Sequence, residues 1–202
     1  MRFRMTIKAK GNVGIVILAA GSSSRLGSPK QILPYKNTTL LQNTIREAIL
    51  VSNVQVLVVT GANREIVQNE ITQTTVKSSS NPDWESGMAS SIVHGLKEML
   101  LVFPETDACI FAVCDQPYVT STIFSQLIKT YQKNTKGIIA SSYADTLGTP
   151  VLFQKKYFKE LFELIGQEGA KKVINRFLDD TIAVPFEKGN IDIDTLEDYS
   201  QL

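Results

Sequence analysis

The chain has 202 residues, of which 43% are hydrophobic and 20% are charged, and its formal net charge is +1. This composition is ordinary for a globular protein. It excludes a disordered chain and gives no general attraction to nucleic acid or an anionic membrane. No apolar run approaches the ~18 residues of a membrane-spanning helix, and residues 1–11 lack the apolar stretch of a signal peptide. We therefore expect a single domain over residues 1–202, located in the cytoplasm, with residues 1–12 as a flexible or peripheral N-terminal extension.

Strands and helices are predicted to alternate along the chain. The strongest signals are three short, nearly all-apolar runs, which are typical of strands buried on both faces. In chain order we predict a strand at 13–19, a helix at 39–51, a strand at 54–60, a helix at 63–71, a weaker strand at 75–79, a helix at 87–101, a strand at 108–113, a helix at 121–133, weaker strands at 137–141 and 150–153, helices at 155–164 and 169–178, a weaker strand at 182–185 and a helix at 195–201. This order predicts an α/β fold, a three-layer αβα sandwich around a mostly parallel sheet. Ligands bind such sheets beyond the carboxyl ends of the strands.

A loop rich in glycine and serine follows the first predicted strand, with the sequence Leu-Ala-Ala-Gly-Ser-Ser-Ser-Arg-Leu-Gly-Ser-Pro-Lys over residues 18–30. Gly21 and Gly27 allow backbone angles that other residues resist, so the loop amides can wrap an anion. Arg25 and Lys30 bring positive charge suited to phosphate oxygens. The spacing is neither that of a P-loop nor that of the dinucleotide fingerprint. The composition predicts a triphosphate-binding loop, and the alternative is an ordinary solvent-exposed turn.

Carboxylates stand at two places where a cation could bind. Asp115 comes directly after the third apolar strand, in the sequence Val-Cys-Asp-Gln-Pro. Magnesium prefers such a position, with one or two carboxylates and substrate phosphates as ligands. Near the C-terminus, Asp192 and Asp194 would share one face of an extended segment, so both could approach one metal ion. The alternatives are that Asp115 is a turn residue and that Asp194 or Thr195 caps the last helix.

The segment 81–96 reads Asn-Pro-Asp-Trp-Glu-Ser-Gly-Met-Ala-Ser-Ser-Ile-Val-His-Gly-Leu. Gly87 opens a predicted helix whose first residues are small, which would leave free amides and hydroxyls for the edge of a nucleobase. Trp84 could either stack on a ligand or pack in the core. A lone helical histidine such as His94 is more often structural than catalytic.

These motifs together resemble the nucleotidyltransferases with a GT-A-like fold. The loop is similar to their signature L-A-A/G-G-x-S-x-R-M/L-G-x-x-K, and Asp-Gln-Pro looks like their metal-binding element. The segment 81–96 resembles N-P-x-W-x-x-G-M-x-x-S-I/L-x-x-G-L of the molybdenum cofactor cytidylyltransferases and their MocA-like relatives. The resemblance runs from residue 13 to residue 199 with the motifs in the expected order, and it implies a Rossmann-like, GT-A-type fold.

The resemblance implies roles for individual residues. Arg25 would support the leaving pyrophosphate, and Lys30 would stabilise charge at the α-phosphate, so that Lys30, Arg25 and Asp115 are the expected catalytic residues. Asp115 would bind Mg²⁺ with Asp194 as the second ligand, since the C-terminal sequence is similar to D-I-D-T-P-E-D-Y, and Asp192 is the weaker substitute. The residues expected to bind the nucleotide are Leu18, Ala19, Ala20, Gly21, Ser22, Ser23, Arg25, Lys30, Gly87, Ser91 and Asp115.

The acceptor side is implied by a second group of residues. Gly148 and Pro150 match the family element G-x-P-x-x-F, and Gln116 and Pro117 of the Asp-Gln-Pro element are also expected to contact substrate. Gln167 departs from the family because it stands where aspartate is usual, and this weakens the assignment of the acceptor more than that of the chemistry.

The function implied by the resemblance is transfer of CMP from CTP to the terminal phosphate of molybdopterin, with Mg²⁺ as cofactor and release of pyrophosphate. Ala20 favours CTP, although relatives that use other triphosphates share Leu-Ala-Ala-Gly. A molybdenum hydroxylase or its accessory protein is a further expected partner, and neither nucleic acid nor a membrane is. Two alternatives stay open: transfer to a sugar phosphate or another alcohol phosphate, and a non-catalytic accessory protein that binds molybdopterin for a molybdoenzyme.

Overall fold

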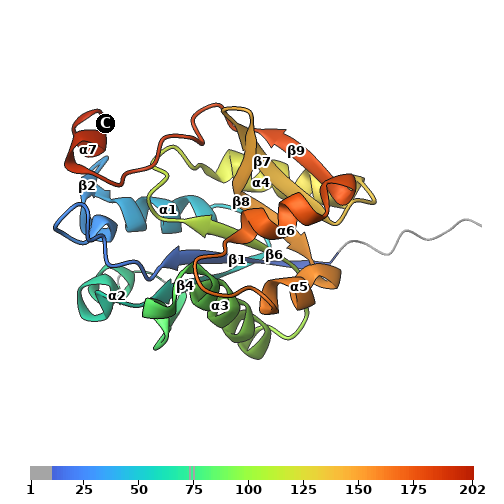
Figure 1. Cartoon of the computed structure of the whole chain (residues 1–202), viewed down its shortest axis with the longest axis horizontal. Helices are drawn as coiled ribbons and strands as arrows, with labels where there is room; N and C mark the ends of the chain where they lie inside the picture. Colours follow the sequence, from blue (N-terminus) through green and yellow to red (C-terminus); the bar gives the residue numbers. More distant parts are fainter. Residues whose placement is uncertain (1–10, 73, 75) are drawn as a thin grey trace, which may run out of the picture.

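The computed structural model describes residues 11–72, 74 and 76–202, and a seven-stranded sheet runs through this part of the chain (Figure 1). Its strands, from one edge to the other, are β5 (Lys77–Ser80), β4 (Val54–Thr60), β1 (Asn12–Ala19), β6 (Thr106–Val113), β8 (Thr146–Gln154), β7 (Ile138–Tyr143) and β9 (Thr181–Pro185). Among these strands β8 alone runs antiparallel to its neighbours. The prediction of a mostly parallel α/β sheet is therefore confirmed.

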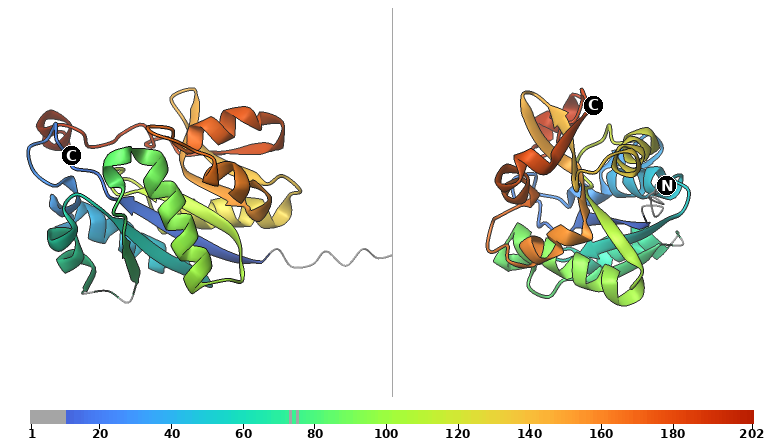
Figure 2. Two further views of the ribbon diagram at one scale, coloured as in Figure 1. Left: turned by 60° about the horizontal axis from the view of Figure 1, so that its bottom comes forward. Right: turned by 90° about the vertical axis from the view of Figure 1, so that its right-hand side faces the viewer.

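Helices cover both faces of the sheet, because its central strands are apolar on both sides. Successive residues of β1 point to opposite faces, so that Ile15 and Ile17 join one core cluster and Val16 joins the other. The first cluster includes residues of α1 (Leu40–Ile49), α2 (Arg64–Thr72) and α4 (Ser121–Lys133), and the second includes residues of α3 (Met88–Val102), α5 (Phe158–Phe162) and α6 (Ala170–Arg176). Figure 2 shows the sheet between these two helical layers.

Some elements differ from the prediction. The predicted helix at 155–164 is a 3₁₀ turn followed by the short α5, and β8 begins at Thr146 rather than at 150. A small hairpin of β2 (Pro34–Tyr35) and β3 (Thr38–Thr39) follows the glycine-rich loop and was not predicted, because two-residue strands are too short to leave a periodic pattern. The last helix, α7 (Leu196–Ser200), is capped by Thr195.

Other predictions agree or fall outside the described residues. The N-terminal extension lies mostly on residues 1–10, and the first residue of the predicted strand 75–79 is also outside the described part of the chain. Cys109 and Cys114 are buried in different core clusters and are not bonded to each other. No helix among the described residues combines the length and the apolar character needed to cross a membrane.

The carboxyl ends of β1, β4 and β6 meet at one edge of the sheet, because these three strands are parallel neighbours. The C-terminal segment returns to this edge, where the Ile193 amide donates to the Asp115 carbonyl at 3.0 Å. Ile193 is fully buried with Leu26 of the glycine-rich loop and Leu40 of α1. The fold therefore brings three distant segments of the sequence to one place.

Candidate functional site

The glycine-rich loop after β1 is held open by one buried side chain. Gln31 is 1% exposed, and its Nε2 donates to the carbonyls of Ala19 and Gly21 at 3.0 and 2.9 Å. Ser23 has a positive φ of 57°, and its hydroxyl accepts from the Lys30 amide at 3.0 Å. Within the described residues, the backbone amides of residues 22–25 have no hydrogen-bond acceptor. The loop thus has free N–H groups available to an anion, and its role as a triphosphate-binding loop stays a prediction.

Lys30 lies between two carboxylates at the mouth of this loop. Its Nζ donates to Asp115 Oδ2 at 2.6 Å, to Asp194 Oδ1 at 2.8 Å and to the Ile193 carbonyl at 3.3 Å. The side chain is only 15% exposed, and burial opposes its charge. The two aspartates outweigh that penalty and raise the pKa of Lys30. The lysine is therefore a fixed positive charge at the carboxyl edge of the sheet.

The pKa values of the neighbouring residues Asp194 and Asp192 are shifted in opposite directions. The hydrogen bond from Lys30 lowers the pKa of Asp194, and Arg25, whose Nη1 lies 3.1 Å from Asp194 Oδ2, adds to this effect. Burial raises the pKa of Asp192, and the negative charges of Asp115 and Asp194 raise it further. Asp115 and Asp194 thus pair directly with Lys30, whereas Asp192 influences this centre only through the repulsion between the carboxylates.

A divalent ion fits this pair of carboxylates chemically. Asp115 and Asp194 already direct oxygens at one cation, the Lys30 ammonium, and hard oxygen ligands suit Mg²⁺ or Mn²⁺. In the described part of the chain no group of three or more His, Cys, Asp or Glu side chains forms a complete metal site. Phosphate oxygens and water would therefore have to complete the coordination, which is the usual manner of binding for Mg²⁺.

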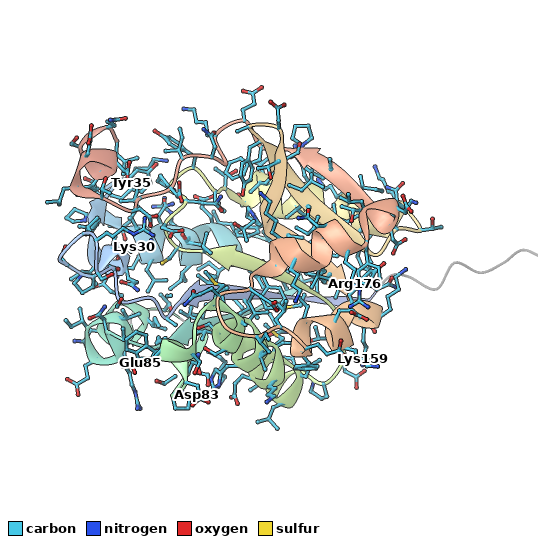
Figure 3. The ribbon with its side chains drawn as sticks, viewed as in Figure 1. Lys30, Tyr35, Asp83, Glu85, Lys159 and Arg176 are labelled. Atoms are coloured by element: carbon cyan, nitrogen blue, oxygen red, sulfur yellow. The ribbon has the colours of Figure 1, made fainter. Side chains whose placement is uncertain are left out.

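A cleft of about 370 Å³ lies beside Lys30. Figure 3 shows that Lys30 and Glu85, which both line the cleft, lie at the same end of the molecule. The structure brings together here nine of the predicted nucleotide-binding residues: Leu18, Ala19, Ala20, Gly21, Ser22, Lys30, Gly87, Ser91 and Asp115. Ser23 and Arg25 do not line it, because Ser23 turns back to the Lys30 amide and Arg25 is 75% exposed beside Asp194.

The start of α3 forms the opposite wall of the cleft and corrects one prediction. The amides of Gly87 and Ala89 are not free, because they donate to the carbonyls of Trp84 and Gly166 at 3.1 Å each. Gly87 has a φ of 107°, and a Cβ there would lie 2.3 Å from the Gly166 carbonyl oxygen. Glycine is therefore required at residue 87 for the close approach of the loop before α6, and not to expose amides.

Side chains supply the polar groups that remain on this wall. Ser91 Oγ accepts from Asn81 Nδ2 at 3.1 Å, so its own proton is available to a ligand. Trp84 and Glu85 line the cleft as well, and so does Gln167, at the residue where the sequence departs from the pattern it resembles. The sequence pattern gave Gln31 and Gln167 no role in the nucleotide site, since neither follows a periodic or charged signal.

The predicted acceptor residues are more scattered. Gly148 lines a second, mostly apolar cleft of about 300 Å³, which shares Leu18 and Met88 with the first. Pro150 is buried, and its carbonyl accepts from the Ser141 hydroxyl at 2.7 Å. Of these residues, Gly148 alone lies on the surface of a described cleft.

Gln116 and Pro117 lie inside the protein. Gln116 is 4% exposed and donates from Nε2 to the Gly189 carbonyl at 2.6 Å. Pro117 is buried, and its carbonyl faces the Asn43 amide nitrogen at 3.5 Å. Both residues therefore contact the protein itself, because the chain turns inward directly after Asp115.

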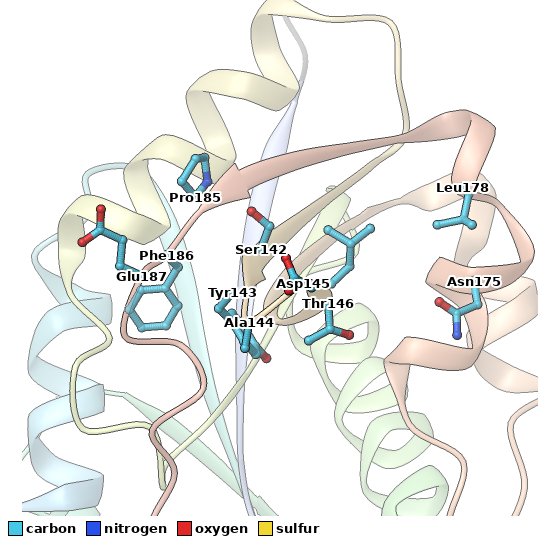
Figure 4. A pocket seen from close by; sticks show the side chains of 11 residues that line it. Ser142, Tyr143, Ala144, Asp145, Thr146, Asn175, Leu178, Pro185, Phe186 and Glu187 are labelled. Atoms are coloured by element: carbon cyan, nitrogen blue, oxygen red, sulfur yellow. The ribbon is translucent and has the colours of Figure 1, made fainter.

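Another cavity, of about 640 Å³, is not the phosphate site. It lies beyond the turn between β7 and β8 and is bordered by Tyr143, Asp145, Phe186 and Glu187 (Figure 4). None of its lining residues is a lysine or an arginine, so it offers no positive charge to a phosphate.

His94 lies away from the cleft, on α3, and has a structural environment. Its Nε2 is 2.8 Å from the Ser79 hydroxyl of β5, and burial lowers its pKa. A neutral imidazole that joins a helix to an edge strand explains this residue without catalysis, in agreement with the structural interpretation of the sequence.

Comparisons of the sequence with known proteins show which family the chain matches. The family model of the MobA-like NTP transferase domain matches residues 15–181. The chain is 25% identical over 189 residues to the molybdenum cofactor cytidylyltransferase of Escherichia coli (strain K12), covering 93% of each chain. It is 28% identical over 204 residues to the nicotine blue oxidoreductase of Paenarthrobacter nicotinovorans, covering 93% of this chain and 94% of that protein.

A solved structure is similar over nearly the whole chain. Rv0371c from Mycobacterium tuberculosis H37Rv has a TM-score of 0.82 at 27% sequence identity, with 95% of this chain and 97% of that chain covered. Another structure of Rv0371c, with a TM-score of 0.78 and 26% identity over 95% of this chain and 97% of that chain, is a complex with manganese.

Proposed function

Because the chain belongs to the MobA-like NTP transferase family, we propose that it is a magnesium-dependent cytidylyltransferase that transfers CMP from CTP to the terminal phosphate of molybdopterin. The similarity to a molybdenum cofactor cytidylyltransferase over 93% of both chains supports this acceptor. The nucleotidyltransferase class follows from the family, and the choice of CTP and molybdopterin is the proposal.

The reaction requires one bond to form and one to break. An oxygen of the acceptor phosphate attacks the α-phosphorus of CTP, and the bond from this phosphorus to the oxygen that bridges it to the β-phosphorus breaks. Pyrophosphate leaves with the electron pair. The attacking phosphate is mostly dianionic near pH 7, since its second pKa is about 6, so no general base is needed. The protein must therefore align two anions and neutralise their charge.

The residues of the cleft are suited to these tasks. At the entrance of the cleft, the free amides of residues 22–25 would hold the β- and γ-phosphates, and the exposed Arg25 guanidinium, paired with Asp194, would support the leaving pyrophosphate. Lys30 would move from the two carboxylates toward the α-phosphate, where negative charge develops. Asp115 and Asp194 would hold Mg²⁺, which when bound neutralises the phosphate oxygens.

One observation carries the proposal: Lys30 and two carboxylates meet within 2.8 Å at the mouth of a cleft formed by the glycine-rich loop. A protein that only stored or delivered molybdopterin would need neither the lysine nor the aspartates. This arrangement therefore supports transfer chemistry over the accessory role.

The direct test is incubation of the purified protein with CTP, Mg²⁺ and molybdopterin. We expect release of one pyrophosphate for each CMP joined to the acceptor, and no release when Mg²⁺ is removed with EDTA. A panel of sugar phosphates and other alcohol phosphates tests the nearer alternative. Pyrophosphate release with one of these and none with molybdopterin would replace the proposed acceptor.

The similarity to nicotine blue oxidoreductase supports a second candidate, an oxidation or reduction carried out in the same cleft. The loop lacks the dinucleotide fingerprint, and the Lys30 centre has no obvious use in a redox reaction. Oxidation of NADH or NADPH by the purified protein with an added dye, together with no pyrophosphate release from CTP, would favour this candidate.

A further inference from the structure

The segment 186–195 carries Asp192 and Asp194 to the reaction centre without forming a helix or a strand. Its position therefore depends on individual contacts rather than on a regular hydrogen-bond ladder. Because Asp194 must face Asp115 across Lys30, small shifts of this segment would change the distance between the two carboxylates. The contacts that fix the segment therefore also fix the geometry of the two carboxylates.

Two consecutive residues after β6 hold this segment. The Asp115 carbonyl accepts from the Ile193 amide at 3.0 Å, and Gln116 Nε2 donates to the Gly189 carbonyl at 2.6 Å. The two bonds hold the segment on either side of Asp192: the first ends at Ile193, one residue before Asp194, and the second ends at Gly189, five residues before it. The short stretch that carries Asp115 thus also positions its partner carboxylate.

The backbone at Gly189 is closely packed against two aromatic rings. A Cβ at this glycine would lie 2.2 Å from a ring carbon of Tyr143 and 2.6 Å from a ring carbon of Phe186. The two rings pack edge to face, with centroids 6.1 Å apart. The backbone at residue 189 is therefore packed against aromatic rings and fixed by the Gln116 amide.

The other end of the Gln116 amide is unpaired. Among the described residues its Oε1 is buried and has no hydrogen-bond partner. A buried acceptor without a partner is unfavourable, and a leucine or methionine of similar size would avoid it. The useful part of this side chain is thus its N–H group, which binds the Gly189 carbonyl.

We propose that Gln116 is a positioning residue of the transferase: it does not touch substrate, and it sets the distance between Asp194 and Asp115 through Gly189. The inference rests on the proposed function, because it assumes that these two carboxylates bind a divalent ion together. It also replaces the direct substrate contact predicted for Gln116 by an indirect role.

The test is Mn²⁺ binding to the full chain, measured by electron paramagnetic resonance with CTP present and no acceptor. Gln116→Leu removes the unpaired oxygen but also leaves the Gly189 carbonyl without its donor, so we expect the melting temperature to fall by about a few degrees while the fold is kept. We expect its Mn²⁺ affinity to fall by about tenfold, comparable to the loss of other outer contacts of metal ligands. We expect kcat to fall, and we expect the KM for CTP to change by a smaller factor. Gln116→Met, with an unbranched side chain, gives a second variant.

Asn43→Leu is the matched control. Asn43 is a buried amide that reaches the Pro117 carbonyl on the same turn, and its hydrogen bonds in the described chain go to Pro117 and Arg46 rather than to the segment 186–195. We expect its Mn²⁺ affinity to equal that of the unmodified protein. Equal Mn²⁺ affinity in Gln116→Leu, Gln116→Met and the unmodified protein would overturn the positioning role and leave the proposed function intact. Absence of Mn²⁺ binding by the unmodified protein in the presence of CTP would overturn the proposed function itself.

Discussion

Two regions beyond the carboxyl ends of the strands, the nucleotide side and the acceptor side, differ in how firmly hydrogen bonds and packing fix their conformation. On the nucleotide side, meaning the loop 18–31, the start of α3 and Asp115, buried polar side chains make the fixing contacts: Gln31 donates to backbone carbonyls of the loop, and Asn81 donates to serine hydroxyls of α3. On the side where we propose that the acceptor binds, called the acceptor side and meaning residues 142–149 and 185–187, the turn of the β7–β8 hairpin is exposed, with positive φ at Ala144 and Asp145.

The charges of the two sides differ as well. Lys30 and Arg25 stand on the nucleotide side, whereas the acceptor-side cavity has the carboxylates of Asp145 and Glu187 and no basic lining residue. A triphosphate needs fixed donors and positive charge, and these exist before it binds. Under the proposed function, this cavity would bind uncharged or donor-rich parts of the acceptor, and the acceptor phosphate would be directed to Lys30. Substitutions on the two sides should therefore affect nucleotide binding and acceptor binding separately.

The largest effect is expected for Asp115→Asn. It keeps the size of the side chain but removes one of the two charges at the metal-binding centre. Turnover should fall by at least about a thousandfold, as for the loss of a group that stabilises transition-state charge. Pyrophosphate release and the melting temperature are the measurements. Asp145→Asn on the acceptor side is the control and should leave CTP affinity unchanged. Retained activity in Asp115→Asn with an unaltered magnesium requirement would remove Asp115 from the metal site.

A smaller but more diagnostic effect is expected for Lys30→Met. Without the ammonium, Asp115 and Asp194 repel each other and are free to bind a divalent ion. Without nucleotide, the variant should therefore bind Mn²⁺ about tenfold more tightly than the unmodified protein. With CTP present, the missing charge should instead weaken nucleotide binding. Electron paramagnetic resonance and calorimetry measure the two quantities. Weaker Mn²⁺ binding in both states would contradict the competition between lysine and metal.

Gly148→Ala probes the acceptor side. A Cβ at this residue would lie 2.2 Å from the Tyr143 hydroxyl, so the partly exposed ring must shift. We expect the KM for the acceptor to rise a few-fold, by about 1 kcal/mol of lost binding, while CTP affinity stays the same. Initial rates at varied acceptor and calorimetry with CTP test this. A matching loss of CTP affinity would show that the two sides are not independent.

The smallest effect is expected far from both sides, at Asp180. Burial favours its neutral form, but hydrogen bonds from Lys156, Tyr157 and the Gly137 amide outweigh this and lower its pKa. Its contribution to stability is therefore present above its unfolded pKa of about 3.9 and is lost as the pH falls through its lower folded value. Asp180→Asn should lower the melting temperature by a few degrees near pH 7 and by less near pH 3. Thermal unfolding at both values measures this, and a constant difference would contradict it.

The nucleotide side was also the more predictable from sequence. The strands before the glycine-rich loop and before Asp115 are clear apolar runs in the sequence. Because neighbouring parallel strands end at the same edge of the sheet, the loop, Lys30 and Asp115 could be expected to lie together. The resemblance to a known family indicated Asp194 as a partner of Asp115 at a metal ion, but the ion pair of Asp194 with Lys30, which joins residues at opposite ends of the chain, was not predicted. The capping role predicted as the alternative for Thr195 holds alongside it.

What the sequence did not reveal depends on long-range packing. The amides at the start of α3 were expected to be free, but the loop at Gly166 approaches and takes one of them. Gln31 lies in a short 3₁₀ helix (Lys30–Ile32) and Gln116 in a loop, neither with a periodic pattern, and their buried hydrogen bonds reach backbone carbonyls that the chain brings near only when folded. The acceptor side is made of turns and strand ends, whose boundaries shift most easily.

The central claim is that the amides of residues 22–25, Lys30 and a divalent ion on Asp115 and Asp194 bind a triphosphate together. Calorimetric titration of the full chain with CTP, once with Mg²⁺ and once with EDTA, measures this directly. We expect tight, saturable binding with Mg²⁺ and at least about tenfold weaker binding without it. Equal affinity under the two conditions, or no binding of CTP, GTP, ATP or UTP with Mg²⁺ present, would contradict the claim.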